Sequence, residues 1–391
     1  MRDTLVAGVW EMKKLTVLVG NGLSIACNPD FRVEKLTEAV IDEMRNNDLL
    51  LGSVYLPMLR IAQKHEHLRH DVDFEDLLGP HYLHYMDLRR AMEIVDTYAP
   101  SDSSARSALE TATEAAWSVS RTGLKAVLAV LFRTAQSPNS DISPARDFIE
   151  LLHDYFPEGL VSYFTLNFDN LLHRAVRAIF RDFSTVQDLA EGWSGKKLLV
   201  QGRWPITGNR LRSQYRVRNS NIRAEILHLH GSLQFWREGI SGDVFKLSDE
   251  AIMSADLLKS LGGVKPKMLR PVVLVGTSEL KAHFLAQAPY AQAFERMREA
   301  LAQSTHLVIA GTSMRDEHIR EEILSAMAAR DMKVLVVDKC EAPPEWLAEI
   351  NNLAPGPSRR GSVFLHLNGL ETLGRSKEWV EFAKSSTGPD A

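Results

Sequence analysis

The sequence predicts an α/β protein with a doubly wound, mostly parallel, Rossmann-like sheet and a large helical insertion. The first observation behind this prediction is a series of short apolar, β-branched runs, most of which end in Gly or Asp, as parallel strands do before a ligand-facing loop. The second is that helical patterns, at 291–304 and 316–331, separate the last three runs. Strands that alternate with helices pair in parallel, and ligands bind such sheets at the carboxyl ends of the strands.

Six runs are the expected strands. They are TVLVG (16–20), LVSYFTLNF (160–168), ILHLHG (226–231), PVVLVG (271–276), HLVIAG (306–311) and KVLVVD (333–338). The sequence LLHRAVRAIF that follows the second run predicts a helix directly after that strand.

The interval 32–150 differs, because it carries long helical patterns and little strand signal. We therefore expect a helical insertion subdomain at 32–150, between the first and second core strands. The α/β domain is then formed by 12–31 and 151–384, and residues 385–391 are expected to be a disordered tail.

A second interval, 175–225, is predicted to be irregular and locally basic. It has six arginines between 203 and 223 and no acidic residue among them. Two interpretations remain open, a solvated loop region or a contact surface for an anionic ligand or partner.

Composition sets limits on the class of protein. The chain has 391 residues, of which 45% are hydrophobic and 25% charged, as in an ordinary soluble globular protein. The net charge of −4 decides nothing about a nucleic-acid partner, and we do not expect direct nucleic-acid binding. Two cysteines, Cys27 and Cys340, cannot form a disulfide framework or a four-cysteine zinc site. With no apolar run of membrane-spanning length and no signal peptide, the expected location is cytoplasmic.

The first expected strand runs straight into Gly20-Asn21-Gly22-Leu23-Ser24. Two glycines remove Cβ bulk where a turn is tight and where a backbone or ligand comes close. The loop is therefore either an ordinary strand-to-helix turn or a loop whose backbone N–H groups face a phosphate.

Polar residues follow other strands. Asn167 and Asp169 stand at the end of the second run, where ligand-binding side chains collect in this architecture, although Asp169 is equally suited to cap the next helix. Strand alternation predicts that His228 and His230 share one face, and Gly231 lets a backbone or ligand approach. A histidine here is either structural or functional.

The last two expected strands also end in polar groups. Gly311-Thr312-Ser313 forms a strand-to-helix turn with small hydroxyl residues. Asp338 closes KVLVVD and is well placed to accept hydrogen bonds from a ribose.

Taken in order, GNGLS, TLNFD, HLHGS, GTSMRD and VVD resemble the motifs of the sirtuin family. DFEDLL at 73–78 resembles the acidic-aromatic helix of sirtuin-like bacterial proteins, and LVGTSELKAHFLAQAPYAQAF with LVIAGTSMRDEHI is similar to stand-alone sirtuin-like proteins of bacterial antiphage defence. The chain departs from deacylating sirtuins in lacking the four-cysteine zinc module. It also has Ile25 where a dehydrogenase fingerprint has its third glycine.

The resemblance implies that NAD is the substrate and that no zinc is bound. It assigns catalysis to Asn167, which would fix the nicotinamide ribose and position water, to His230 as general base, and to Asp169, which would orient Asn167. His230 suits this role because imidazole titrates near neutral pH. The implied NAD-binding residues are Gly20, Asn21, Gly22 and Ser24 for the pyrophosphate, with Thr165, Gly311, Thr312 and Ser313, and Asp338 for the adenosine ribose.

The function implied by the resemblance is NAD+ hydrolysis, which releases nicotinamide and ADP-ribose and defends against phage by NAD depletion, that is, by abortive infection. A constitutive NADase would kill its host, so we expect activation through assembly or through a partner, such as a HerA-type ATPase or a phage-derived trigger. A homo-oligomer with 32–150 at its interface is expected, and no membrane partner. Two alternatives remain open, a non-catalytic NAD or ADP-ribose sensor of a defence complex and an NAD-dependent protein deacylase.

Overall fold

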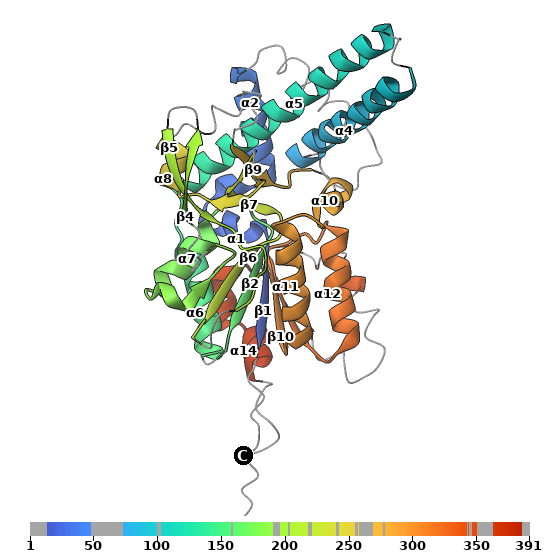
Figure 1. Cartoon of the computed structure of the whole chain (residues 1–391). Helices are drawn as coiled ribbons and strands as arrows, with labels where there is room; N and C mark the ends of the chain where they lie inside the picture. The colour runs from blue at the N-terminus through green and yellow to red at the C-terminus, as the bar shows by residue number, and fades with distance from the viewer. Residues whose placement is uncertain are drawn as a thin grey trace, which may run out of the picture.

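A seven-stranded sheet forms the centre of the protein in the computed structural model (Figure 1), and all of its strands pair in parallel. In spatial order the strands are β12 (Val363–His366), β11 (Lys333–Val337), β10 (His306–Ala310), β1 (Leu15–Val19), β2 (Val161–Thr165), β6 (Ala224–His228) and β3 (Val186–Gln187). The predicted α/β class with a mostly parallel sheet is confirmed. The structure describes residues 14–47, 73–99, 103–157, 159–190, 196–201, 204–217, 221–239, 242–254, 257, 269–276, 278–341, 343, 346–349 and 363–384.

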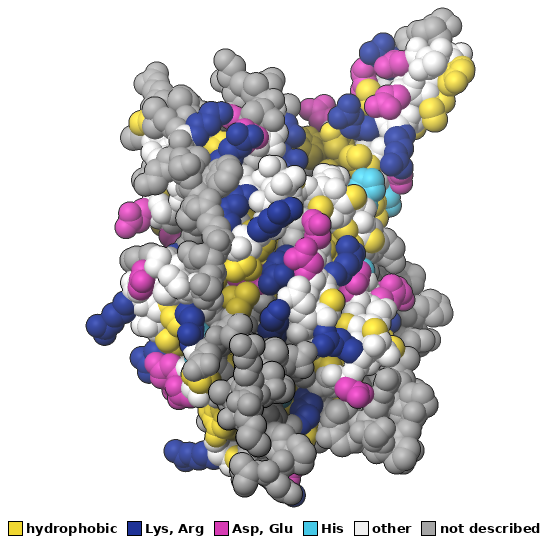
Figure 2. Space-filling view, turned by 60° about the horizontal axis from the view of Figure 1, so that its bottom comes forward, with side chains coloured by type: hydrophobic (Ala, Val, Ile, Leu, Met, Phe, Trp, Pro, Cys, Tyr) yellow, Lys and Arg dark blue, Asp and Glu magenta, His cyan; other side chains and the backbone are white. Residues whose placement is uncertain are grey.

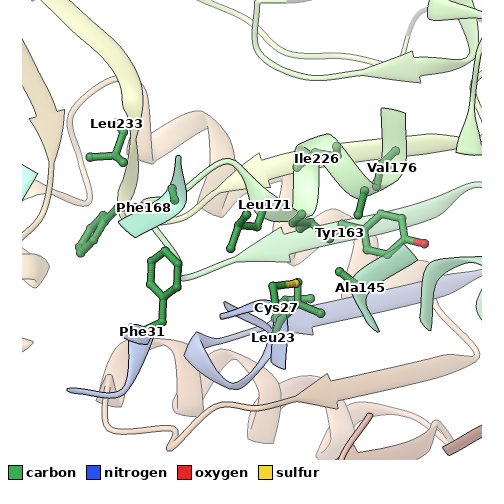
Figure 3. Close-up of a cluster of buried hydrophobic side chains, with 14 of the residues drawn as sticks. Leu23, Cys27, Phe31, Ala145, Tyr163, Phe168, Leu171, Val176, Ile226 and Leu233 are labelled. Atoms are coloured by element: carbon green, nitrogen blue, oxygen red, sulfur yellow. The ribbon is translucent and has the colours of Figure 1, made fainter. Parts of the chain in front are cut away.

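Helices cover both faces of this sheet because its strands are apolar on both sides. Val17 and Val19 of β1 face one hydrophobic core, and Leu18 between them faces the other. The first core is closed by α6 (Ser143–Tyr155), α7 (Leu171–Ile179) and α14 (Lys377–Lys384), and the second by α11 (Tyr290–Gln303) and α12 (Glu317–Ala329). Figure 3 shows part of the first core, where Leu23 and Cys27 pack near Ala145 and Tyr163.

A second, five-stranded antiparallel sheet was not predicted. Its order is β4 (Lys196–Gln201), β5 (Trp204–Arg210), β8 (Val244–Lys246), β7 (Gly231–Glu238) and β9 (Leu269–Val273). The run PVVLVG therefore contributes to β9 of this antiparallel sheet, so its expected place among the parallel strands is wrong. The description of 175–225 as irregular is also wrong, because β3, β4 and β5 lie there; short strands interrupted by Gly and Pro give little periodic signal. Arg203 and Arg218 of that interval lie outside the described residues.

Every described element between β1 and β2 is helical. These elements are α1 (Asn21–Cys27), η1 (Pro29–Phe31), α2 (Val33–Asn47), α4 (Phe74–Tyr98), α5 (Ser103–Ala135) and α6. Figure 1 shows α4 and α5 side by side, projecting beyond the body of the molecule, and the same projection stands out at the upper right of Figure 2. The α6 helix runs through residue 150 and packs on the sheet, so it belongs to the sheet's first core. The expected tail at 385–391 lies outside the described residues.

The α4 helix begins with a capping box. The Asp73 carboxylate accepts hydrogen bonds from the backbone amides of Glu75 and Asp76, and the Asp76 side chain accepts one from the Asp73 amide. This local arrangement fixes where the helix starts, and it places Glu75 in the first turn. The remaining short helices are η2 (Phe183–Thr185), α8 (Asp249–Ser254), α10 (Ser278–Phe284) and η3 (Leu370–Arg375).

One described helix, Ser104–Ala135, is long and apolar enough to cross a membrane by length and composition alone. Its residues Ala126, Val127 and Leu128 are buried in the protein core. A core helix of this kind passes the same test, so the finding is weak evidence for a membrane span.

Candidate functional site

The neighbouring strands β1 and β10 connect onward in opposite directions. β1 leads to β2 on one side, whereas β10 leads to β11 on the other side. Such a switch point leaves a crevice outside the carboxyl ends of the two strands, where open α/β sheets bind ligands. The loops that begin at Gly20 and Gly311 lie at this point, at the carboxyl ends of β1 and β10, where the sequence pattern placed them.

These two loops approach each other so closely that side chains would not fit. A Cβ on Gly22 would lie 2.5 Å from the Cα of Gly311, and a Cβ on Gly20 would lie 2.6 Å from the carbonyl oxygen of Gly311. The amide of Gly20 donates to the Ala310 carbonyl over 2.9 Å, and the amide of Gly22 donates to the Gly311 carbonyl over 2.8 Å. The glycines are thus explained by contact between loops, while their contact with a pyrophosphate stays a prediction.

The side chain of Asn167 joins the ends of β1 and β2. Its Nδ2 donates to the Gly20 carbonyl and to the Ser24 hydroxyl, each over 2.9 Å. The Ser24 hydroxyl donates in turn to Asp169 Oδ2 over 2.6 Å, and Thr165 Oγ1 accepts the Asn167 amide over 3.1 Å. The structure therefore brings together five of the residues that the sequence singled out.

Asp169 has two roles in this arrangement. One carboxylate oxygen accepts the Ser24 hydroxyl, and the other accepts the amide of Leu171 at the start of α7 over 2.9 Å. Burial raises the pKa of Asp169, and these two hydrogen bonds oppose that effect. Asp169 thus caps the helix and also reaches Asn167, through the Ser24 hydroxyl.

His228 and His230 contact different groups. β6 ends at His228, and His230 lies in the turn before β7, so the expectation that one continuous strand carries both rings on one face is wrong. The reason is Gly231, whose φ of 85° turns the chain into the second sheet. His228 Nδ1 lies 3.1 Å from the Asn167 carbonyl oxygen, whereas His230 Nε2 lies 3.6 Å from Asp316 Oδ2.

A chain of titratable groups starts at His230 and ends at Glu75 on α4. The second carboxylate oxygen of Asp316, Oδ1, lies 3.1 Å from Lys281 Nζ. This ammonium group lies 2.8 Å from the carboxylate of Glu75 in α4. Only 5% of Lys281 is exposed. The sequence did not predict this chain of groups. Glu75, Lys281 and Asp316 all lie in motifs that resemble sirtuin-like proteins, but nothing in the sequence marks Lys281 as a buried charge.

Burial controls the protonation of these groups. It lowers the pKa of His230 to about 3, although Asp316 opposes this, and it lowers the pKa of His228 to about 4. Burial disfavours the ionised form of Asp316, but His230 and Lys281 outweigh it and lower its pKa. Burial also raises the pKa of Glu75 to about 7. His230 is therefore neutral at physiological pH, and the assumption that it titrates near neutrality is wrong in this environment.

The loop after β10 contains two residues in the left-handed backbone region. Gly311 has a φ of 60°, and Met314, which is 2% exposed, has a φ of 52°. Such a conformation is uncommon for a non-glycine residue and is often found at functional sites. The Thr312 hydroxyl holds the turn by accepting the Met314 amide over 3.2 Å, and Ser313 is exposed.

Two predicted binding residues lie at the margins of the cluster. Asn21 donates from its side chain to the Phe31 carbonyl over 2.8 Å, so it braces its own segment. Asp338 follows β11, the strand next to β10, where its carboxylate accepts the Lys339 amide over 2.8 Å and burial raises its pKa.

His230, Asp316 and His318 place three possible metal-ligating atoms within 4.8 Å of one another. The Nε2 atoms of both histidines are buried and have no hydrogen-bond partner among the described residues. Two histidines and a carboxylate are a ligand set that catalytic zinc uses. However, the ammonium group of Lys281, 3.1 Å from the Asp316 carboxylate, opposes a further positive charge there, and we assign no metal to this cluster.

Residues 161–354 match a SIR2-like domain. No curated protein matches the chain. The chain is similar to the solved structures of Sir2 bound to acetylated peptide (TM-score 0.41, 10% identity, 93% of this chain and 90% of that chain covered), of Sir2Tm bound to a propionylated peptide (0.38, 10%, 94% and 94%) and of Sir2 with a p53 peptide and NAD+ (0.38, 9%, 93% and 90%). The matched domain starts at β2, so it includes the strand ends that carry Asn167, His230 and Thr312.

Proposed function

We propose that this chain, which carries a SIR2-like domain, is an NAD+ glycohydrolase that releases nicotinamide and ADP-ribose. A SIR2-like domain suggests NAD-dependent activity in general. The observation that carries the more specific proposal is the joint presence of Asn167 and His230 at the ends of adjacent strands, beside the switch point of the sheet. Ligands bind at such a point in open α/β sheets, and these two side chains supply the acceptors that hydrolysis needs.

Hydrolysis breaks the bond between C1′ of the ribose and the pyridinium nitrogen. The bonding electrons pass to the ring, so nicotinamide leaves as a neutral molecule and the ribose becomes an oxocarbenium-like cation. Water adds to C1′ and loses one proton, which gives ADP-ribose. The protein must therefore orient the ribose, place the water on one face and accept the proton.

Asn167 is suited to orient the ribose or the water. The Nδ2 group donates one hydrogen bond to the Gly20 carbonyl and one to the Ser24 hydroxyl, and these two bonds fix the plane of the amide. Its Oδ1 accepts no hydrogen bond from the described residues, so this acceptor remains available for a ribose hydroxyl or for water. Asp169 supports the arrangement through Ser24.

His230 is neutral, so its imidazole can accept a proton, but in the closed site burial lowers its pKa to about 3 and disfavours the imidazolium ion. Entry of water and NAD+ would raise this pKa toward the range of a general base. When the ring takes up a proton, the Asp316 carboxylate at 3.6 Å would stabilise the imidazolium ion. On the other side of the switch point, Thr312, Ser313 and Asp338 would hold the phosphates and the adenosine ribose. No zinc enters this scheme, which uses no cysteine of the chain.

The candidate catalytic side chains are closed off from solvent. His230 is 2% exposed and Asn167 is 8% exposed, and we propose that the surrounding loops or helices move to admit NAD+. This supports an enzyme that stays silent until assembly, a HerA-type ATPase partner or a phage-derived trigger opens the site. With the motif resemblance to antiphage proteins, we propose that the activated enzyme defends the cell by depleting NAD.

Incubation of the purified chain with NAD+ tests this function, with nicotinamide and ADP-ribose measured by chromatography. A glycohydrolase releases nicotinamide without an acyl peptide; a deacylase releases it only when an acyl-lysine peptide is present, and a sensor binds NAD+ without turnover. We expect Asn167→Ala and His230→Ala each to reduce release at least about a hundredfold. Near-normal release by both variants, with unchanged circular dichroism, would show that the site is assigned wrongly.

A further inference from the structure

A cavity of about 480 Å³ lies between the helices α4 and α5 and the strand β9. The residues that line it include none of the site residues discussed above. Its volume is within the range of roughly 300–1,000 Å³ that small-molecule sites occupy. The cavity therefore requires an explanation separate from the switch point.

Aromatic side chains form one part of the wall. Tyr85 of α4 and Trp117 of α5 have ring centroids 4.8 Å apart, and Tyr82 lies 5.8 Å from the ring of Phe284. Tyr290 of α11 also lines the cavity. Tyr82, Tyr85 and Trp117 are only partly buried, so they are accessible to a flat ligand.

The polar part of the wall is basic. Four arginines line the cavity, Arg89, Arg121, Arg237 and Arg270, and none of the described residues that line it is Asp or Glu. Arg237 donates to the Ala288 carbonyl over 2.7 Å. Within the described part of the chain, neither Arg121 nor Arg270 is ion-paired with a carboxylate. Such a wall has an excess of positive charge that an anionic ligand would neutralise.

We propose that this cavity binds a small aromatic anion of the nucleotide class. Arginine binds phosphate through two parallel hydrogen bonds, and tyrosine and tryptophan rings stack on nucleobases. A purely apolar ligand would leave the positive charge of Arg121 and Arg270 without a counter-charge, and an inorganic anion would make no use of the aromatic wall. A ligand with both a ring and a phosphate uses both parts.

The cavity is connected to the candidate site through two elements. The amide of Leu274, just after β9, donates to the His230 carbonyl over 2.8 Å, and α4 carries Glu75 to Lys281. A ligand that contacts α4 and β9 would therefore change nicotinamide release. This second expectation rests on the proposed function, whereas binding itself does not.

Isothermal titration calorimetry on the full chain tests the binding. The probes are AMP and ATP, with adenosine as a ring without phosphate and pyrophosphate as an anion without a ring. The informative variants are Arg121→Gln, Arg270→Gln and Trp117→Ala. Arg90→Gln is the matched control, because Arg90 lies on the same helix as Arg89 but pairs with Asp87 at 3.5 Å and does not line the cavity.

We expect AMP or ATP to bind with a Kd below about 1 mM, and at least about tenfold more weakly to Arg121→Gln and Arg270→Gln. Arg90→Gln and Asn167→Ala should bind as the unaltered chain does. The proposal is overturned when neither nucleotide binds, when adenosine binds as tightly as AMP, or when Asn167→Ala abolishes binding and the arginine variants keep it. Should Trp117→Ala fail to fold, the two partly exposed arginine variants still decide the outcome. Binding is measured without turnover, so its result is independent of the NADase test.

Discussion

The ammonium group of Lys281 lies 3.1 Å from the carboxylate of Asp316, deep in the protein, and this pair links the helical insertion to the candidate site. Glu75 of α4 contacts the same ammonium group, and His230 lies next to the same aspartate. A movement of α4 therefore changes the partners of Lys281, which in turn changes the charge around His230. Through these contacts, the helical insertion can affect the protonation of His230 although α4 itself does not touch the substrate.

We predict that Asp316→Asn lowers nicotinamide release about a hundredfold or more, because the imidazolium ion of His230 would lose its stabilising carboxylate. Asp316 acts here as a positioning residue, so the pH profile of activity should change, and Asp316→Glu should restore part of the rate. Glu317→Gln is the matched control, since Glu317 is the adjacent acid but is 67% exposed. A normal pH profile and rate for Asp316→Asn would refute the connection.

A second prediction concerns the contact between the two loops. In Gly22→Ala the new Cβ would lie 2.5 Å from the Gly311 Cα, which belongs to backbone and cannot move aside. We expect the free energy of unfolding to fall by about 1–3 kcal/mol, the usual cost of overpacking. Gly374→Ala is the control, since its Cβ would lie 3.5 Å from Leu151, an ordinary contact. Urea unfolding of both variants should show a lower midpoint for Gly22→Ala alone; equal midpoints would mean that the loops tolerate bulk.

The third prediction is a loss of stability in acid. Burial lowers the pKa of His153 from 6.5 to about 4, and those of His228 and His230 are also lowered. A folded-state pKa below the unfolded value means that the unfolded chain binds more protons. The free energy of unfolding is therefore not reduced by these groups above pH 6.5. It falls as the pH falls toward 4, by up to about 1.4 kcal/mol per pH unit for each histidine.

His153→Phe isolates one of these groups without touching the candidate site. His153 packs against Phe180 with ring centroids 4.6 Å apart, so an aromatic replacement preserves much of the contact. Denaturant unfolding between pH 7.5 and 4.5 should show a shallower loss of stability for this variant than for the unaltered chain. Identical slopes would mean that His153 is not held neutral in the fold.

The sequence was most informative where one residue pattern is tied to one backbone geometry. Apolar runs located β1, β2, β6, β10 and β11, and Gly20 and Gly311 marked the carboxyl ends of β1 and β10. The second sheet escaped prediction because β8 has only three residues, because Pro205 and Gly208 interrupt the pattern of β5, and because β5 pairs with β8 far along the chain. Long-range pairing leaves no periodic signal in a single strand.

Side-chain partners were less predictable than strand ends. The link from Asn167 through Ser24 to Asp169 joins segments 143 and 145 residues apart, so local spacing could not show it. The protonation of His230 also depends on burial by distant segments, which residue type alone does not reveal. The burial of Lys281 likewise depends on distant segments, which its local sequence does not show.

The last prediction concerns assembly. The apolar stretch at 124–132 packs within this chain, where Val127 and Leu128 are buried. Among the described residues, two exposed large apolar side chains lie on the projecting helix α4, where Ile94 is 59% exposed and Tyr98 is 82% exposed. Large exposed apolar groups on a projecting element indicate a protein contact, and most soluble oligomers are formed by copies of one chain.

We therefore predict a homo-oligomer in which the far end of α4 contacts a neighbouring subunit. Light scattering coupled to gel filtration should give a multiple of the 43.9 kDa chain mass. Ile94→Glu with Tyr98→Glu should reduce the particle size, because two charges would be buried at the contact. Met253→Glu is the control, since Met253 is 63% exposed on α8 and outside the α4–α5 pair. A monomer with full NADase activity on its own would rule out both the contact and its part in activation, because the enzyme would then need no assembly to open its site.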